Sequence, residues 1–144
     1  MKRLLIFIGL LTIGEVGIAK AETIAQCGAM KGYAYYYPNP FIKEKDYGFG
    51  EDGISSGSFS IVLTDQKYDV IYTDATGVTS SSKADGTHVI TIGDNPEFLV
   101  FFIGYPGATG EIYSFHKASK TLTMLQHKFT GLIPSSKLMV ANCW

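Results

Sequence analysis

Apolar and polar residues alternate with a period of two through most of the chain. From residue 58 onward, short runs of β-branched and aromatic residues recur, separated by clusters of Gly, Asp, Asn, Pro and Ser. This rhythm is typical of an antiparallel meander, and no stretch after residue 21 keeps the 3.6-residue period of a helix. The pattern predicts strands at 32–37, 58–64, 67–74, 87–92, 97–105, 110–117, 120–128 and 136–143.

Two hairpins predict which side chains share a face. A turn at Asp65-Gln66 pairs the strand before it with the strand after it, and a turn at Ala118-Ser119 does the same further along. In both registers one face is apolar, which makes it the candidate core. The residues predicted to face the core are Phe59, Ile61, Leu63, Tyr68, Val70, Tyr72, Tyr113, Phe115, Leu122 and Met124.

The run from Phe98 to Ile103 breaks the alternation, because both of its faces are apolar. Such a strand is covered on both sides, or it offers one face to a ligand or partner. A bare strand of this kind is an aggregation hazard, so we expect the N-terminal segment or a long loop to cover it.

These strands predict an all-β fold. A small antiparallel meander barrel of about eight strands would leave no open edges, and a two-sheet β-sandwich is the alternative. An eight-stranded barrel is either filled by side chains or just wide enough for one small ligand. The many Phe and Tyr residues favour a filled interior.

The N-terminus has the pattern of a secretory signal. Lys2 and Arg3 precede an apolar run that ends in Ala19-Lys20-Ala21, which matches an A-x-A cleavage site. The run is too short for a membrane-spanning helix, which needs about 20 apolar residues. The sequence therefore predicts a signal peptide at 1–21, a single β domain at 22–144, no membrane span, and export to the periplasm or the exterior.

Two cysteines, Cys27 and Cys143, lie near the ends of the predicted mature chain. An even count in an oxidising compartment favours a disulfide, which would place the N- and C-terminal strands side by side. The alternative is a lipoprotein signal that acylates Cys27, although Gln26 departs from the small residue usual before such a cysteine.

Charge and composition exclude several function classes. Arg3 is the only arginine of the sequence, and without residues 1–21 nine lysines face twelve acids. A net charge of −3 and no guanidinium group make nucleic-acid binding unexpected.

No motif identifies a reaction. Residues 53–57 match G-x-S-x-G, but a strand is expected after them where a hydrolase needs a helix. The three histidines are scattered, and the acids at 46–52 lack the EF-hand spacing. We therefore predict no catalytic residue, no metal site and no cofactor.

The densest unusual feature is a group of tyrosines beside a long glycine-rich segment, 39–57, that is expected to be a loop or a lid. Three of the tyrosines share one face of a predicted strand and the fourth lies on the other. Exposed tyrosines suit recognition, whereas inward-facing ones would fill the barrel. The candidate binding residues are Tyr33, Tyr35, Tyr36, Tyr37, Tyr47 and Phe49.

Gly32-Tyr33-Ala34-Tyr35-Tyr36 and Gly50-Glu51-Asp52-Gly53-Ile54-Ser55, together with the export signal and the two terminal cysteines, resemble small exported bacterial proteins without an assigned activity. The resemblance implies location and architecture only. Two functions remain open. One is a protein-binding or inhibitor-type module, and the other is a carrier of a small apolar ligand in the barrel mouth. An enzyme is not expected.

Overall fold

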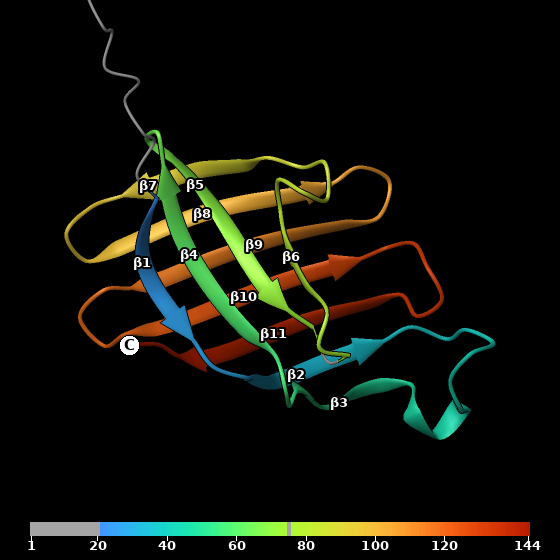
Figure 1. Ribbon diagram of the computed structural model, residues 1–144. Coiled ribbons are helices and arrows are strands. Elements are labelled where there is room, and N and C mark those ends of the chain that lie inside the picture. The colour runs from blue at the N-terminus through green and yellow to red at the C-terminus, as the bar shows by residue number, and fades with distance from the viewer. Residues whose placement is uncertain (1–20, 75) are drawn as a thin grey trace, which may run out of the picture.

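The protein is a two-layer β structure (Figure 1), known from a computed structural model that describes residues 21–74 and 76–144. A four-stranded antiparallel sheet has the order β1-β4-β5-β6, and a seven-stranded antiparallel sheet has the order β3-β2-β11-β10-β9-β8-β7. The strands are β1 (Glu22–Cys27), β2 (Met30–Tyr36), β3 (Gly48–Ile54), β4 (Ser58–Thr64), β5 (Lys67–Thr73), β6 (Thr79–Ser81), β7 (Val89–Asp94), β8 (Phe98–Tyr105), β9 (Thr109–His116), β10 (Thr121–Lys128) and β11 (Ser135–Asn142). One 3₁₀ turn, η1 (Glu44–Asp46), lies between β2 and β3.

The architecture is the sandwich alternative, and the barrel prediction is wrong. In Figure 1 the strands of the smaller sheet cross obliquely over one face of the larger sheet. Neither sheet closes on itself, because β1 and β6 end one sheet and β3 and β7 end the other. The chain departs from a simple meander because β4 pairs with β1, and two strands, β2 and β3, lie between them in the chain.

Both predicted hairpin registers are confirmed. Phe59 pairs with Tyr72 across β4 and β5, and Phe115 pairs with Leu122 across β9 and β10. The first turn is sharp because Asp65 and Gln66 both have positive φ, at 50° and 62°, the arrangement of a two-residue hairpin whose twist matches its strands.

All eight predicted strands exist, with ends within two residues of those expected, and three more strands accompany them. β6 has only three residues, and β1 lies directly after the predicted signal peptide. β3 occupies part of the segment 39–57, which was expected to be a loop or a lid. That expectation is wrong, because residues 48–54 pair along their whole length with β2 as an edge strand.

The core lies between the two sheets. It is formed by Ala25, Cys27, Met30, Phe59, Ile61, Val70, Leu99, Phe101, Ile103, Tyr113, Phe115, Leu122, Met124, Met139 and Ala141. Seven of the ten predicted core residues belong to it, and Tyr68 and Tyr72 pack against it. Leu63 is the exception, since it is only half-buried next to the β4–β5 turn.

A disulfide joins Cys27 to Cys143, as predicted. Cys27 ends β1 and Cys143 follows β11, so the bond ties the smaller sheet to the larger one. Backbone hydrogen bonds between Gln26 and Trp144 extend the tie, and β2 pairs with β11, which confirms that the terminal strands are adjacent. The bond also leaves Cys27 unavailable for the alternative, acylation.

The predicted signal peptide lies outside the described residues except for Ala21. Within 21–74 and 76–144, no helix has the length and apolar character to cross a membrane.

Candidate functional site

Among residues 21–74 and 76–144, the seven-stranded sheet has one face that other strands cover and one face that they leave uncovered. Along β8, Leu99, Phe101 and Ile103 point into the core, whereas Val100 and Phe102 point to the other side. We call that side the outer face. The N-terminal segment forms β1 of the opposite sheet, and the segment 39–57 adds an edge strand beside β2. The expectation that either would cover the second apolar face of this strand is therefore wrong.

A continuous line of apolar side chains crosses the outer face. Each member is the direct cross-strand neighbour of the next, from β7 through β8, β9, β10 and β11 to β2. Leu125 and Leu138, near its middle, are 52% and 50% exposed, and Tyr33 is 58% exposed. We call this line the apolar row: Ile90, Phe102, Ile112, Leu125, Leu138 and Tyr33.

A second line of residues lies on the same face, two positions along each strand from the apolar row. It has glycines at one side of the sheet and aromatic residues at the other. It begins with Gly104 and Gly110, continues through His127 and Ser136, and ends at Tyr35 and Phe49. We call it the glycine-aromatic row. A Cβ built on Gly104 would stand 2.9 Å from the Phe102 ring, so that ring lies over bare backbone.

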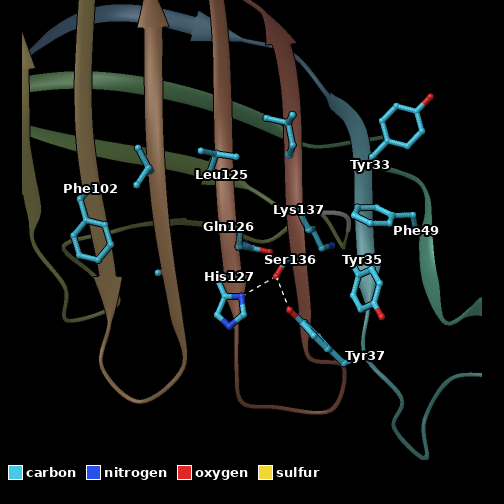
Figure 2. A pocket seen from close by; sticks show the side chains of 13 residues that line it. Tyr33, Tyr35, Tyr37, Phe49, Phe102, Leu125, Gln126, His127, Ser136 and Lys137 are labelled. Carbon is cyan, nitrogen blue, oxygen red and sulfur yellow. Dashed lines mark hydrogen bonds between the residues drawn. The ribbon is translucent and has the colours of Figure 1, made fainter.

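These two rows surround a groove of about 820 Å³. Figure 2 shows Phe102 on one side of it, Tyr35, Tyr37 and Phe49 on the other, and Leu125 between them. The floor comes from β9, β10 and β11. The groove is open to solvent along its length, so it is a surface for contact rather than an enclosed chamber.

The aromatic side of the groove is a chain of rings in contact. Ring centroids lie 5.1 Å apart for Phe49 and Tyr35, 5.0 Å for Tyr35 and Tyr37, 6.2 Å for Tyr37 and His127, and 6.1 Å for His127 and Phe129. The first three contacts are edge-to-face and the His127–Phe129 contact is stacked, and aromatic contacts of both kinds are favourable beyond the area they bury. The rings therefore hold one another in place.

Ser136 fixes the middle of this chain. Its hydroxyl hydrogen-bonds to the Tyr37 hydroxyl at 3.2 Å and to Nδ1 of His127 at 2.7 Å, as the dashed lines in Figure 2 show. A surface whose side chains are already held loses less conformational entropy when a partner binds.

Four of the six predicted binding residues come together in the groove: Tyr33, Tyr35, Tyr37 and Phe49. The two others do not. Tyr47 is half-buried in the β2–β3 connection, where its hydroxyl donates to the backbone oxygen of Asn39 at 2.9 Å. Tyr36 lies on the opposite face of β2. Of the two possibilities for the row of Tyr33, Tyr35 and Tyr37, filling the interior or lying at the surface, the structure has the second, because the row lines the groove on the outer face.

Tyr36 belongs to a charged cluster on the inner side of the sheet edge. Lys137 forms a 2.7 Å ion pair with Asp52 and lies 5.7 Å from the centre of the Tyr36 ring. Burial, and then the hydrogen bond with Asp52, raises the pKa of Tyr36 to about 12. Burial would also raise the pKa of Asp52, but hydrogen bonds from Lys137 and Tyr36 outweigh it and lower that pKa. The cluster joins β2, β3 and β11.

Sequence reasoning missed most of the groove, including Phe102, Ile112, Leu125, Leu138, His127 and Ser136. The signal for some of them was present. The doubly apolar run 98–103 contains Phe102, and Leu138 stands beside the buried Met139. A strand with apolar residues at consecutive positions has something apolar on each face. The pattern alone does not tell which face is left uncovered.

One carboxyl group lies inside the sandwich. Glu111 is 7% exposed and accepts hydrogen bonds from the Tyr113 hydroxyl at 2.8 Å and from Nε2 of Gln126 at 2.7 Å. Its pKa is raised, because desolvation of the charged form outweighs both hydrogen bonds. It points away from the outer face, so it belongs to the core rather than to the groove.

The remaining candidate chemistry is dispersed. Residues 53–57 comprise the end of β3 and the turn to β4, with Gly57 N–H donating to Ile54 O at 3.1 Å, and a strand follows. In the part of the chain that the structure describes, no three or more His, Cys, Asp or Glu side chains are grouped to hold a metal ion. Comparison with protein-family models, curated proteins and solved structures finds no match to this chain.

Proposed function

We propose that the mature chain is an exported protein-binding module, and that its contact surface is the outer face of the seven-stranded sheet. The observation that carries the proposal is the apolar row, which crosses six strands and has five of its six side chains exposed, with Phe102 half-buried. Contiguous exposed apolar surface rimmed by polar residues marks interaction sites in folded proteins.

The composition of the outer face supports an apolar partner surface. Beyond the apolar row lies a third line, Val100, Ser114, Thr123, Val140 and Lys31, which we call the mixed row. When the three rows are followed across the described strands to the edge of the sheet, the charged side chains on them are Lys31 on β2 and Glu51 on β3, which pairs with Tyr33. Both lie at the β2–β3 edge. The centre is uncharged and carries aromatic and aliphatic groups, the composition of interface cores.

The shape of the site favours a protein over a small ligand. A small-molecule site usually buries most of the surface of its ligand, whereas this groove is open. The alternative function, a carrier of a small apolar ligand, placed that ligand in the mouth of a barrel. The sandwich has no such mouth, and core side chains occupy the space between its sheets.

Export is part of the proposal, together with the resemblance to small exported proteins. The disulfide suits an oxidising compartment, and the N-terminal pattern of Lys2, Arg3 and Ala19-Lys20-Ala21 suits a cleaved signal. Binding rather than catalysis agrees with the position of Glu111, which faces the core and not the groove.

The test compares two lysine substitutions in the mature protein, used as bait for the native exported fraction. Leu125→Lys places a charge at the centre of the apolar row. Ile71→Lys is the matched control, since Ile71 is an exposed aliphatic residue on a strand of the other sheet. Both should keep the melting temperature near that of the parent. We expect the parent and Ile71→Lys to capture the same protein and Leu125→Lys to lose it. Equal capture by all three would place the binding surface elsewhere.

A further inference from the structure

We infer that the partner covering the outer face is a second copy of this chain, packed face to face about a two-fold axis that runs along β10. The inference rests on the proposed function and names its partner. A two-fold interface uses the same surface on both subunits, so that surface must complement itself. The outer face meets this requirement in area, pattern and charge.

The area matches that of a stable dimer. Seven strands at about 4.8 Å spacing and about eight residues at roughly 3.3 Å rise give a face of about 29 by 25 Å. That is roughly 700 Å², close to the about 800 Å² that each partner contributes to a standard specific interface. A second sheet of the same size would cover the apolar row from Ile90 to Tyr33, which a smaller occupant would leave partly in water.

The apolar row is balanced about β10, the middle strand of the sheet. A two-fold axis along β10 places Leu125 against Leu125 of the other copy. It places Ile112 of one copy opposite Leu138 of the other, because these two residues lie one strand from β10 on either side. Two strands away on either side, Phe102 comes opposite Tyr33. Every central pair is apolar on both sides.

The glycine-aromatic row adds aromatic contacts. Gly104 lies two strands from β10 on one side, and Tyr35 lies two strands from β10 on the other. The same axis therefore sets the Tyr35 ring of each copy against the Phe102 ring that lies over Gly104 of the other. Contacts between aromatic rings are favourable beyond the area they bury, and the two-fold axis makes this contact twice.

The charges also agree with this axis. Lys31 would face Val100 and Glu51 would face Ile90, both toward the rim of the interface where water reaches them. Neither charge faces its own copy. A two-fold axis perpendicular to the strands, drawn through the apolar row, would bring the two Glu51 carboxylates together. The axis along β10 is therefore favoured.

Sedimentation equilibrium of the purified mature protein tests the inference. We expect a dimer that dissociates on dilution, with Leu125→Lys raising the dissociation constant by about 100-fold or more, as loss of a central contact at a hot spot does. Leu138→Lys should act in the same direction, and Ile71→Lys should leave the constant unchanged. A dimer that persists in both outer-face variants would overturn the inference, because the contact would then lie elsewhere.

Chemical cross-linking tests the axis. In Leu125→Cys the two thiols would meet near the axis, so a short bismaleimide should join the chains. In Ile90→Cys, three strands from β10, the thiols would lie about 29 Å apart and should stay unlinked. Linking of Ile90→Cys alone would contradict the axis. A protein that is monomeric at every concentration, yet still captures another protein through Leu125, would overturn the inference and leave the proposed function standing. A monomer that captures nothing would contradict both.

Discussion

The two faces of the seven-stranded sheet are built by the same strands and differ in what covers them. On the inner face, Phe101 and Met124 are buried under the four-stranded sheet. On the outer face, their chain neighbours Phe102 and Leu125 line an open groove. The apolar character of a strand residue therefore does not decide its burial. Burial here depends on which face the smaller sheet crosses, and one sheet of four strands can cover one face only.

This difference between the two faces predicts that one face stabilises the fold and the other binds a partner. Apolar surface that is buried on folding stabilises the domain, and apolar surface that stays exposed is available to stabilise a complex. The inner face should therefore dominate the free energy of unfolding, and the outer face should dominate association. The following changes test this division, beginning with the largest expected effect.

Removing the disulfide should have the largest effect, because it joins the two sheets that enclose the inner face. In a Cys27→Ala, Cys143→Ala variant, the unfolded chain regains the freedom of a loop with a sequence separation of 116. The expected loss in free energy of unfolding is about 4 to 5 kcal/mol, measured by urea denaturation. Treating the parent protein with a reductant should give the same loss.

If the variant and the reduced parent unfold at the same urea concentration as the oxidised parent, the disulfide contributes little to the free energy of unfolding. Pairing and packing within the sandwich would then maintain the fold without it.

Neighbouring phenylalanines on opposite faces give the next contrast. Phe101→Ala removes a fully buried ring that stacks on Tyr113 with centroids 5.1 Å apart, and it should cost about 3 to 5 kcal/mol. Phe102→Ala removes a half-buried ring over Gly104 and Gly110 and should cost about 1 kcal/mol. Thermal unfolding of the two variants measures the difference. Equal losses would show that both faces are covered in the folded protein.

The buried carboxyl group predicts a pH dependence of the inner face. Burial raises the pKa of Glu111 above its ordinary value of about 4.5. Because the folded state favours the protonated form, this group's contribution to stability is complete below about pH 4.5 and is lost as the pH rises through the folded-state pKa.

Glu111→Gln should therefore flatten the pH dependence of the melting temperature above about pH 4.5. The new amide oxygen can accept the hydrogen bond from Gln126, and the new N–H group can donate to the Tyr113 hydroxyl. Val78→Thr, at an exposed position without a titratable group, is the control and should leave the profile unchanged. A variant profile that follows the parent would mean that Glu111 does not titrate with folding.

Single outer-face substitutions should have the smallest effect on stability. Tyr33→Ser removes a ring that is 58% exposed and should change the free energy of unfolding by under about 0.5 kcal/mol. The same change removes one end of the apolar row and should weaken partner capture. A large drop in melting temperature would place Tyr33 in the stabilising part of the molecule.

The sequence predicted the strands and registers well because local rules govern them. Turn residues such as Asp65-Gln66 and strict alternation around Phe59 and Phe115 determine a hairpin without reference to the rest of the chain. β1 and β3 were missed, because β1 is a short and partly polar strand and β3 is rich in glycine. Their strand conformation comes from pairing with β4 and β2, strands that were recognised.

The smaller part of the candidate site was predicted, for a related reason. Tyr33, Tyr35 and Tyr37 stand out as a cluster within one strand, so they are visible in the sequence. Leu125 and Leu138 lie on separate strands and become neighbours only through the order of the sheet. The choice of sandwich over barrel, which leaves the outer face open, depends on a pairing between distant strands that no short pattern contains.

Hydroxyl-radical footprinting of the mature protein, with and without its bound partner, tests the division of the two faces most directly. In the unbound protein, Tyr33, Leu125 and Leu138 should be oxidised readily, and the inner-face Phe101 should be protected. In the complex, the three outer-face residues should become protected, and Trp144, which is 70% exposed beyond β11, should keep its rate. Unchanged oxidation of Tyr33, Leu125 and Leu138 in the complex would contradict the assignment of the outer face as the binding surface.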